Sequence, residues 1–101
     1  MSNNLINEMN SNKNTLNMIV SDIVVCRNKK DRILKKLIIY IKNHPLEETL
    51  IDNNQYNGNN PCILSLIDQL DDIIIILNDL KEIYRENRRN SDKLIHIYNT
   101  N

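Results

Sequence analysis

The sequence predicts an all-α protein in which two long helices fold back on each other as an antiparallel hairpin. Two stretches carry apolar residues at alternating spacings of three and four, which keeps those residues on one side of a helix. A segment bounded by Pro45 and Pro61 separates the two stretches. We expect the 101 residues to form a single helical domain that assembles further into a helical bundle.

The first stretch predicts a helix over residues 5–43. Nine of its eleven positions, which we call rungs, are apolar. The rungs are Leu5, Met9, Asn12, Leu16, Ile19, Ile23, Cys26, Lys30, Ile33, Leu37 and Tyr40. Because proline cannot continue a helix and restricts the residue before it, we expect His44 to lie at the helix end. For residues 1–14 we leave disorder open.

Residues 44–60 are expected to form a connecting loop. Five of its residues tolerate left-handed turn geometry: Asn53, Asn54, Asn57, Gly58 and Asn59. Within the loop, residues 46–51 are interpreted as a single helical turn. We expect its apolar side chains to cap the end of the bundle; these are Leu46, Leu50 and Ile51.

The second stretch predicts a helix over residues 61–98. Asn60 followed by Pro61 is typical of an N-cap followed by the first helical position. Nine of the eleven rungs are again apolar. They are Ile63, Leu66, Leu70, Ile73, Leu77, Leu80, Tyr84, Asn87, Ser91, Leu94 and Tyr98.

An alternative fold has three or four shorter helices, with breaks near residues 27–31 and 88–91. Charged residues and asparagines interrupt the apolar pattern at both places, and Ser91 is a candidate N-cap of a new helix. We favour two long helices because the rungs keep their register across both interruptions, whereas a turn usually resets it.

Rungs of the two helices pair so that their residue numbers sum to 103, as an antiparallel hairpin requires. This register sets Asn12 level with Ser91 and places Lys30 opposite Ile73. We call the line of contact between the two helices the seam. Polar residues in an otherwise apolar seam fix the register of the helices and the choice of partner, at some cost in stability. We interpret four rungs in this way, while giving equal weight to simple tolerance at an exposed seam: Asn12, Lys30, Asn87 and Ser91.

Apolar residues also flank the rungs, and two helices packed only on each other do not need so wide a stripe. The flanking residues are Val20, Val24, Leu34, Ile38, Ile41, Ile67, Ile74, Ile76 and Ile83. We therefore expect this face to bind a second copy of the chain, a helical protein partner, or both.

Residues 27–42 carry seven basic side chains against Asp31 alone. Nucleic-acid binding is the alternative function, with six candidate phosphate contacts: Arg27, Lys29, Lys30, Arg32, Lys35 and Lys36. We favour the interpretation that these basic residues interact with the dipole of their own helix and with the acidic residues at the start of the second helix. The predicted register sets Lys35 level with Asp68, and Arg32 level with Asp71.

No motif in the sequence indicates a reaction, so we expect a non-enzymatic protein with no cofactor and no metal site. Cys26 is interpreted as a core residue and Cys62 as a thiol in the first turn of a helix, too far apart for a disulfide. The acidic residues of the second helix lack the Glu-x-x-His partner typical of metal-binding bundles and are interpreted as solubilising charge. They are Asp68, Asp71, Asp72, Asp79 and Glu82.

The sequence lacks the features of a strongly charged, a membrane-spanning or a secreted protein. Formal net charge is zero, the longest apolar runs have five residues, and no signal-peptide pattern occurs. We expect a soluble, intracellular protein without a membrane span. Richness in Asn and Ile indicates an A+T-rich genome. The sequence thus predicts an oligomeric α-helical interaction module acting as a scaffold, adaptor or assembly factor.

Overall fold

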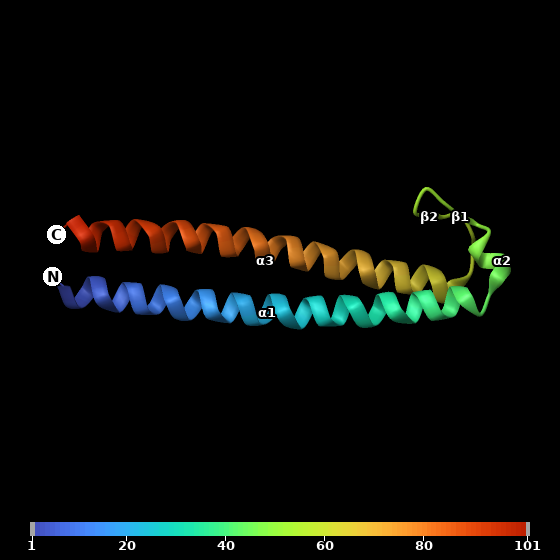
Figure 1. Ribbon diagram of the computed structural model, residues 1–101, viewed down its shortest axis with the longest axis horizontal. Helices are drawn as coiled ribbons and strands as arrows, with labels where there is room; N and C mark the ends of the chain where they lie inside the picture. The colour runs from blue at the N-terminus through green and yellow to red at the C-terminus, as the bar shows by residue number, and fades with distance from the viewer. Residues whose placement is uncertain (1, 101) are drawn as a thin grey trace. The chain divides into compact units, whose positions relative to one another are not determined.

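Two long helices and a short connecting segment make up the protein, as the computed structural model in Figure 1 shows. The structure describes residues 2–100. Its elements are α1 (Ser2–Lys42), α2 (Pro45–Glu48), β1 (Ile51–Asp52), β2 (Gln55–Tyr56) and α3 (Pro61–Thr100). The predicted antiparallel hairpin is confirmed: α1 and α3 pack against each other and end within three residues of the expected positions.

Neither long helix is broken. Both α1 and α3 continue through residues 27–31 and 88–91, so the alternative with three or four shorter helices is wrong. Residues 2–14, for which disorder was left open, belong to α1. The continuous rung pattern explains this result, because the stripe of apolar residues stays on one side of each helix through the charged stretches.

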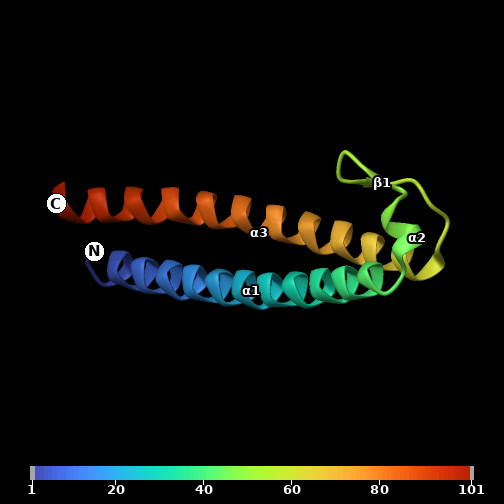
Figure 2. The same ribbon diagram turned by 45° about the vertical axis from the view of Figure 1, so that its right-hand side comes forward.

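Contacts divide the chain into two compact units, each containing a stretch of both long helices. The terminal unit comprises Met1–Val25 and Ile76–Asn101, and the loop unit comprises Cys26–Ile75. Within each unit, the two helices lie side by side in opposite directions in both Figure 1 and Figure 2.

In the loop unit, the core is formed by rungs of both helices. Ile33, Ile63 and Ile73 are buried, and Ile63 has no exposed surface at all. The start of α3 is fixed by Asn60, whose Oδ1 accepts hydrogen bonds from the backbone N–H groups of Cys62 (2.9 Å) and Ile63 (3.2 Å). The predicted N-cap is therefore confirmed, and it places Ile63 where the two helices meet.

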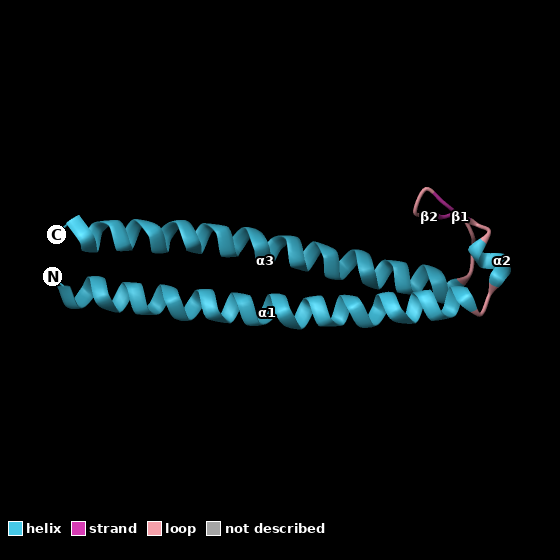
Figure 3. Ribbon diagram, viewed as in Figure 1, coloured by secondary structure: helices cyan, strands magenta, loops and turns pink. Residues whose placement is uncertain are grey.

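The connecting segment differs from the expected loop. The helical turn is α2, shorter than expected, and a two-stranded hairpin of β1 and β2 follows it (Figure 3). Asn53 and Asn54 join the strands with φ values of 52° and 62°, the backbone signature of a type I′ turn. The left-handed geometry of these two asparagines was predicted from the sequence, but the two strands were not.

The predicted apolar cap at the end of the bundle is wrong. Leu46 is 82% exposed, and Leu50 and Ile51 are also exposed. In their place, Tyr56 folds back over Gly58 and approaches the start of α3 through hydrogen bonds. An aromatic ring with a hydroxyl group can both pack and bond at a helix end, which three leucine and isoleucine side chains cannot do.

In the terminal unit, Leu16, Ile19 and Leu77 are buried. A polar contact lies further toward the chain ends, where Asn12 Nδ2 donates to the backbone carbonyl of Asn87 at 3.3 Å. The acceptor is a backbone carbonyl, and the carbonyl of a helical residue points toward the residue four positions later, here Ser91. The hydrogen bond therefore agrees with the predicted register, although its acceptor belongs to Asn87 and not to Ser91.

The rung pattern itself agrees closely with the structure. Over residues 3–42, all eleven rungs of α1 are buried or half-buried, and Ile41 is the only other residue that is. In α3, ten of the eleven rungs are buried or half-buried, while Tyr98 is 50% exposed. The last rung fails because it lies at the end of the helix, where few residues remain to cover it.

Candidate interaction surfaces

Two sides of the helix pair can be told apart from the sequence positions of their residues. Residues directly after a rung lie on one side of the seam, and residues directly before a rung lie on the other side. A two-fold rotation relates two antiparallel helices about an axis perpendicular to their common plane. This rotation does not exchange the two sides of that plane. Residues that follow a rung therefore lie on the same side in both helices.

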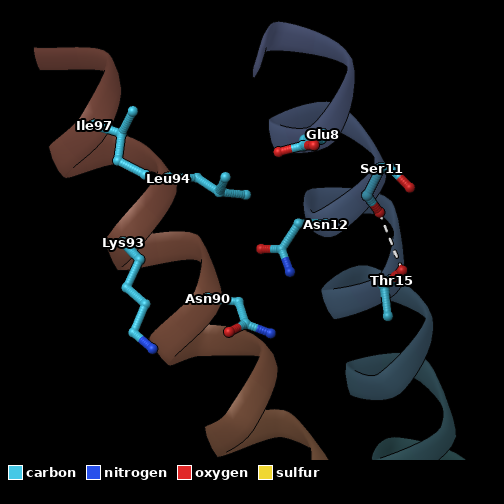
Figure 4. Close-up of a pocket in the computed structure, with 8 residues that line it drawn as sticks. All are labelled: Glu8, Ser11, Asn12, Thr15, Asn90, Lys93, Leu94 and Ile97. Carbon is cyan, nitrogen blue, oxygen red and sulfur yellow. Dashed lines mark hydrogen bonds between the residues drawn. The ribbon is translucent and has the colours of Figure 1, made fainter. Parts of the chain in front are cut away.

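Two grooves of the terminal unit confirm this rule. Apart from rungs, one groove is lined only by residues that follow a rung, namely Asn10, Lys13, Asn17, Val20, Arg88 and Ile95. The other groove, drawn in Figure 4, is lined apart from rungs only by residues that precede one, namely Glu8, Ser11, Thr15, Asn90, Lys93 and Ile97. The two sides are therefore distinct surfaces with different side chains.

In the loop unit, the side that follows the rungs is strongly apolar. We call it the apolar side, and its apolar residues are Leu34, Ile38, Ile41, Leu64, Ile67 and Ile74. Three charged residues also follow rungs there, namely Arg27, Asp31 and Asp71. Of the apolar residues, Ile41 and Ile67 are half-buried, while the other four are exposed. Leu64 was missed in the sequence analysis, although its place directly after the rung Ile63 is the signal that assigns it to this surface.

The remaining predicted flanking residues lie elsewhere. Val20 and Val24 also follow rungs but belong to the terminal unit, where polar Lys13 and Arg88 share the groove with Val20. Ile76 and Ile83 precede rungs, so they lie on the other side of the terminal unit. The nine predicted residues therefore do not form one surface, and the densest apolar group is in the loop unit.

The opposite side of the loop unit is largely polar. Its residues from α1 are Lys29, Arg32, Lys36 and Ile39, and those from α3 before Ile76 are Cys62, Ser65, Gln69 and Asp72. The adjacent residues Ile38 and Ile39 are 44% and 59% exposed. Ile38 lies on the apolar side and Ile39 on the opposite side. Apolar surface in this unit is thus concentrated on one side of the helix pair.

The basic residues of α1 do not share one side. Lys29, Arg32 and Lys36 precede rungs, Arg27 follows one, and Lys35 lies opposite the seam. All five are exposed, and Lys30, itself a rung, is half-buried. Residues 27–42 therefore present three basic side chains together and not the full set of six.

The expected pairing of charges between the helices is not found. Within the described residues, the ion pairs join Arg85 to Glu82 at 2.6 Å and Arg88 to Asp92 at 3.8 Å, both inside α3 and both exposed. Such pairs contribute little to stability. Lys35 and Asp68, predicted to be level, form no ion pair, nor do Arg32 and Asp71.

Asn12 stands out among the polar rungs. In Figure 4 its amide lies between α1 and α3, level with Asn90 and Leu94. Its Nδ2 bonds to Asn87, but its Oδ1 is buried without a hydrogen-bond partner. A buried polar atom without a partner costs free energy, so this rung weakens the seam of the terminal unit.

At the loop end, a chain of hydrogen bonds ties the connecting segment to both long helices. The hydroxyl of Tyr56 donates to Glu47 Oε2 and accepts from the backbone N–H of Asn60 at 3.0 Å. Asn60 Nδ2 in turn donates to the hydroxyl of Tyr40 at 3.0 Å. Partial burial and the hydrogen bond to Glu47 raise the pKa of Tyr56 above its ordinary value of 10.0.

Gly58 and His44 complete this arrangement. A Cβ atom at position 58 would overlap the Tyr56 ring, lying 2.8 Å from Cε1 and closer still to the hydroxyl. His44 stacks on Tyr40 with ring centroids 3.9 Å apart, and its Nδ1–H donates to the Tyr40 carbonyl at 2.7 Å. The predicted place of His44 at the helix end is thus confirmed.

The other candidate chemical groups remain separate. Both cysteines are free thiols, with Cys26 half-buried as a rung and Cys62 exposed. Among residues 2–100, no three His, Cys, Asp or Glu side chains come together as metal ligands would. No described helix combines the length and apolar character needed to cross a membrane.

Comparison of the chain with protein-family models, with curated protein sequences and with solved structures returned no match.

Proposed function

We propose that the protein is a non-enzymatic helical interaction module, which acts as a scaffold, adaptor or assembly factor by packing against helices of another chain. The apolar side of the loop unit is the observation that carries this proposal. Four of its six apolar side chains are exposed although each lies beside a buried or half-buried rung. Within residues 2–100 there is no third long helix that could cover them.

The total exposed area supports the same proposal. The chain exposes 7726 Å², whereas a compact monomer of 11.9 kDa exposes about 5,900 Å². The excess is larger than the roughly 800 Å² that each partner contributes to a standard interface. Covering the four exposed side chains would contribute about 2–5 kcal/mol per chain, since complete burial of one such side chain gives about 1.5–3 kcal/mol.

Sedimentation velocity between 1 and 100 µM tests the proposal. We expect the wild type to associate as its concentration rises. Ile38→Lys, on the apolar side, should weaken this association at least tenfold, because it puts a charge into the covered surface. Ile39→Lys is the matched control, since it changes the adjacent and more exposed isoleucine on the opposite side.

A folded monomer that unfolds cooperatively at every concentration, with equal behaviour of both variants, would contradict the proposal. Circular dichroism of the variants separates loss of association from loss of folding.

Nucleic-acid binding is a second candidate function, and the grouping of Lys29, Arg32 and Lys36 on one side favours it. Phosphate contacts by three side chains predict an affinity that falls steeply with salt. Fluorescence anisotropy with single-stranded and duplex oligonucleotides at 50 and 200 mM salt tests this alternative. Binding that Lys29→Gln/Arg32→Gln/Lys36→Gln abolishes would support it, and an unchanged anisotropy at 50 mM salt would eliminate it.

A further inference from the structure

The two helices of the loop unit carry opposite charge. Its stretch of α1, residues 26–42, holds seven basic side chains and one acidic one. Its stretch of α3, residues 61–75, holds three acidic side chains and no basic one. Since no ion pair joins these stretches within the described residues, their charges are free to meet a partner.

Some of these charges border the apolar side. Asp71 follows the rung Leu70 and so lies between Ile67 and Ile74 on that side, and Asp68 borders it from the outer surface of α3. On α1, Lys35 borders the same side from the outer surface. Arg27 and Lys35 lie one turn before and after Asp31, the single acidic residue of this stretch, so the edge of α1 is net positive.

Two identical hairpins that share one face pack around a two-fold axis lying in the plane between them. When the axis is perpendicular to the helices, α1 lies over the α1 of the second copy, and two strongly basic stretches meet. When the axis is parallel to the helices, α1 lies over the α3 of the second copy, and a basic stretch meets an acidic one. Only the second arrangement is electrostatically complementary.

We propose that a second copy of this chain occupies the apolar side of the loop unit around a two-fold axis parallel to the helices. The loop unit of each copy covers the loop unit of the other, α1 packs on the partner's α3, and the two connecting segments lie at the same end. Lys35 then lies near the aspartates at positions 68 and 71 of the second copy. This inference rests on the proposed function and deepens it by naming the partner and its orientation.

The apolar pattern supports the contact between two loop units. On α1, residues 34, 38 and 41 are apolar and repeat at spacings of four and three. On α3, residues 64, 67 and 74 are apolar, and Asp71 lies in the same series. Each set is a second seam beside the first, as each helix of a four-helix bundle requires. Because both seams are largely apolar in the loop unit, contact between two loop units places apolar residues on apolar residues. The charges of α1 and α3 then favour the parallel axis.

Charge reversal with mixing tests the orientation. We expect Lys35→Glu alone, and Asp68→Lys/Asp71→Lys alone, each to weaken self-association about tenfold at low salt. An equimolar mixture should restore association and give mainly heterodimers, which native mass spectrometry resolves because the two variants differ in mass. Lys36→Glu is the matched control, since it reverses the adjacent charge on the opposite side and should leave association unchanged.

Two other outcomes overturn different statements. If the wild type dimerises and Lys35→Glu has no effect, or if mixing restores nothing, the orientation is wrong while the interaction module stands. If the wild type stays a folded monomer up to 100 µM, the proposed function fails together with this inference.

Discussion

The loop unit and the terminal unit have the same spacing of rungs, but the residues at the rungs and their contacts differ. The loop unit has the fully buried Ile63, the Asn60 N-cap and the hydrogen bonds that join Tyr56 to Glu47 and Asn60 to Tyr40. In the terminal unit, Asn12 occupies a rung with an unpartnered Oδ1, and open grooves line both sides of the seam. The rung spacing therefore determines which side of each helix is buried, and the residues at the rungs determine how strongly this burial stabilises each unit.

The units also differ in what lies beside the rungs. The loop unit collects apolar residues on one side, whereas in the terminal unit Lys13 and Arg88 occupy equivalent positions. An exposed apolar patch that is confined to one unit is typical of a specific interaction site.

The largest expected difference between the units is in the cost of truncating a rung. Ile63→Ala should lower the free energy of unfolding by about 2–5 kcal/mol, because a fully buried side chain leaves a cavity. Leu94→Ala, at a half-buried rung of the terminal unit, should cost roughly half as much. Urea unfolding at one fixed protein concentration measures both, and equal costs would remove the contrast between the units.

Loss of the N-cap should come next. Asn60→Ala removes the acceptor for two backbone N–H groups and the donor to Tyr40, so we expect a loss of about 1–2 kcal/mol. Asn60→Asp keeps the acceptor and should recover most of that loss. Thermal unfolding of the three proteins compares them, and the cap has no role if the Ala and Asp variants behave alike.

A stabilising change is expected in the terminal unit. Asn12→Leu removes the buried Oδ1 that has no partner and should raise the free energy of unfolding by about 1 kcal/mol. Asn10→Leu, at an exposed position two residues away, is the control and should change stability little. A destabilised Asn12→Leu protein would show that the hydrogen bond to Asn87 outweighs the unpartnered oxygen.

The smallest expected effect is a dependence on pH at the loop end. The raised pKa of Tyr56 means that the folded state holds the phenol proton more tightly than the unfolded state does. Its stabilising contribution is therefore complete below about pH 10, the unfolded pKa, and is lost as the pH rises through the folded value.

Melting temperatures of the wild type and of Tyr56→Phe between pH 8 and pH 11.5 test this effect. The difference between the two proteins should be constant up to about pH 10 and then shrink. A constant difference over the whole range would contradict the proposed hydrogen bond to Glu47. The phenylalanine variant also serves as the control for ionisation of the other tyrosines.

Most of the fold was predictable, because periodicity and proline positions report directly on helices. The rung spacing identified the buried side of both helices, and Asn60 with Pro61 gave the first residue of α3. The missed hairpin had a local signal in the pair Asn53 and Asn54, which suits a two-residue type I′ turn. Strands of two residues are too short for any alternation to show.

The candidate surface was predictable in part. Its residues could be listed as flanks of the rungs, but sorting them requires knowing whether each follows or precedes a rung in an antiparallel pair. That step separates Ile76 and Ile83 from Ile67 and Ile74 and adds Leu64. The contacts of Tyr56 could not be predicted, since they depend on how the chain between β2 and α3 bends around Gly58.

The most direct test of the docking surface is the reactivity of a thiol placed on it. In a chain carrying Cys26→Ser and Cys62→Ser, the change Ile38→Cys or Ile39→Cys puts a thiol on the apolar side or on the opposite side. The thiol at position 38 should become protected from alkylation as protein concentration rises, while the thiol at position 39 stays reactive. Equal alkylation rates at both positions at every concentration would contradict the docking of a second copy on the apolar side.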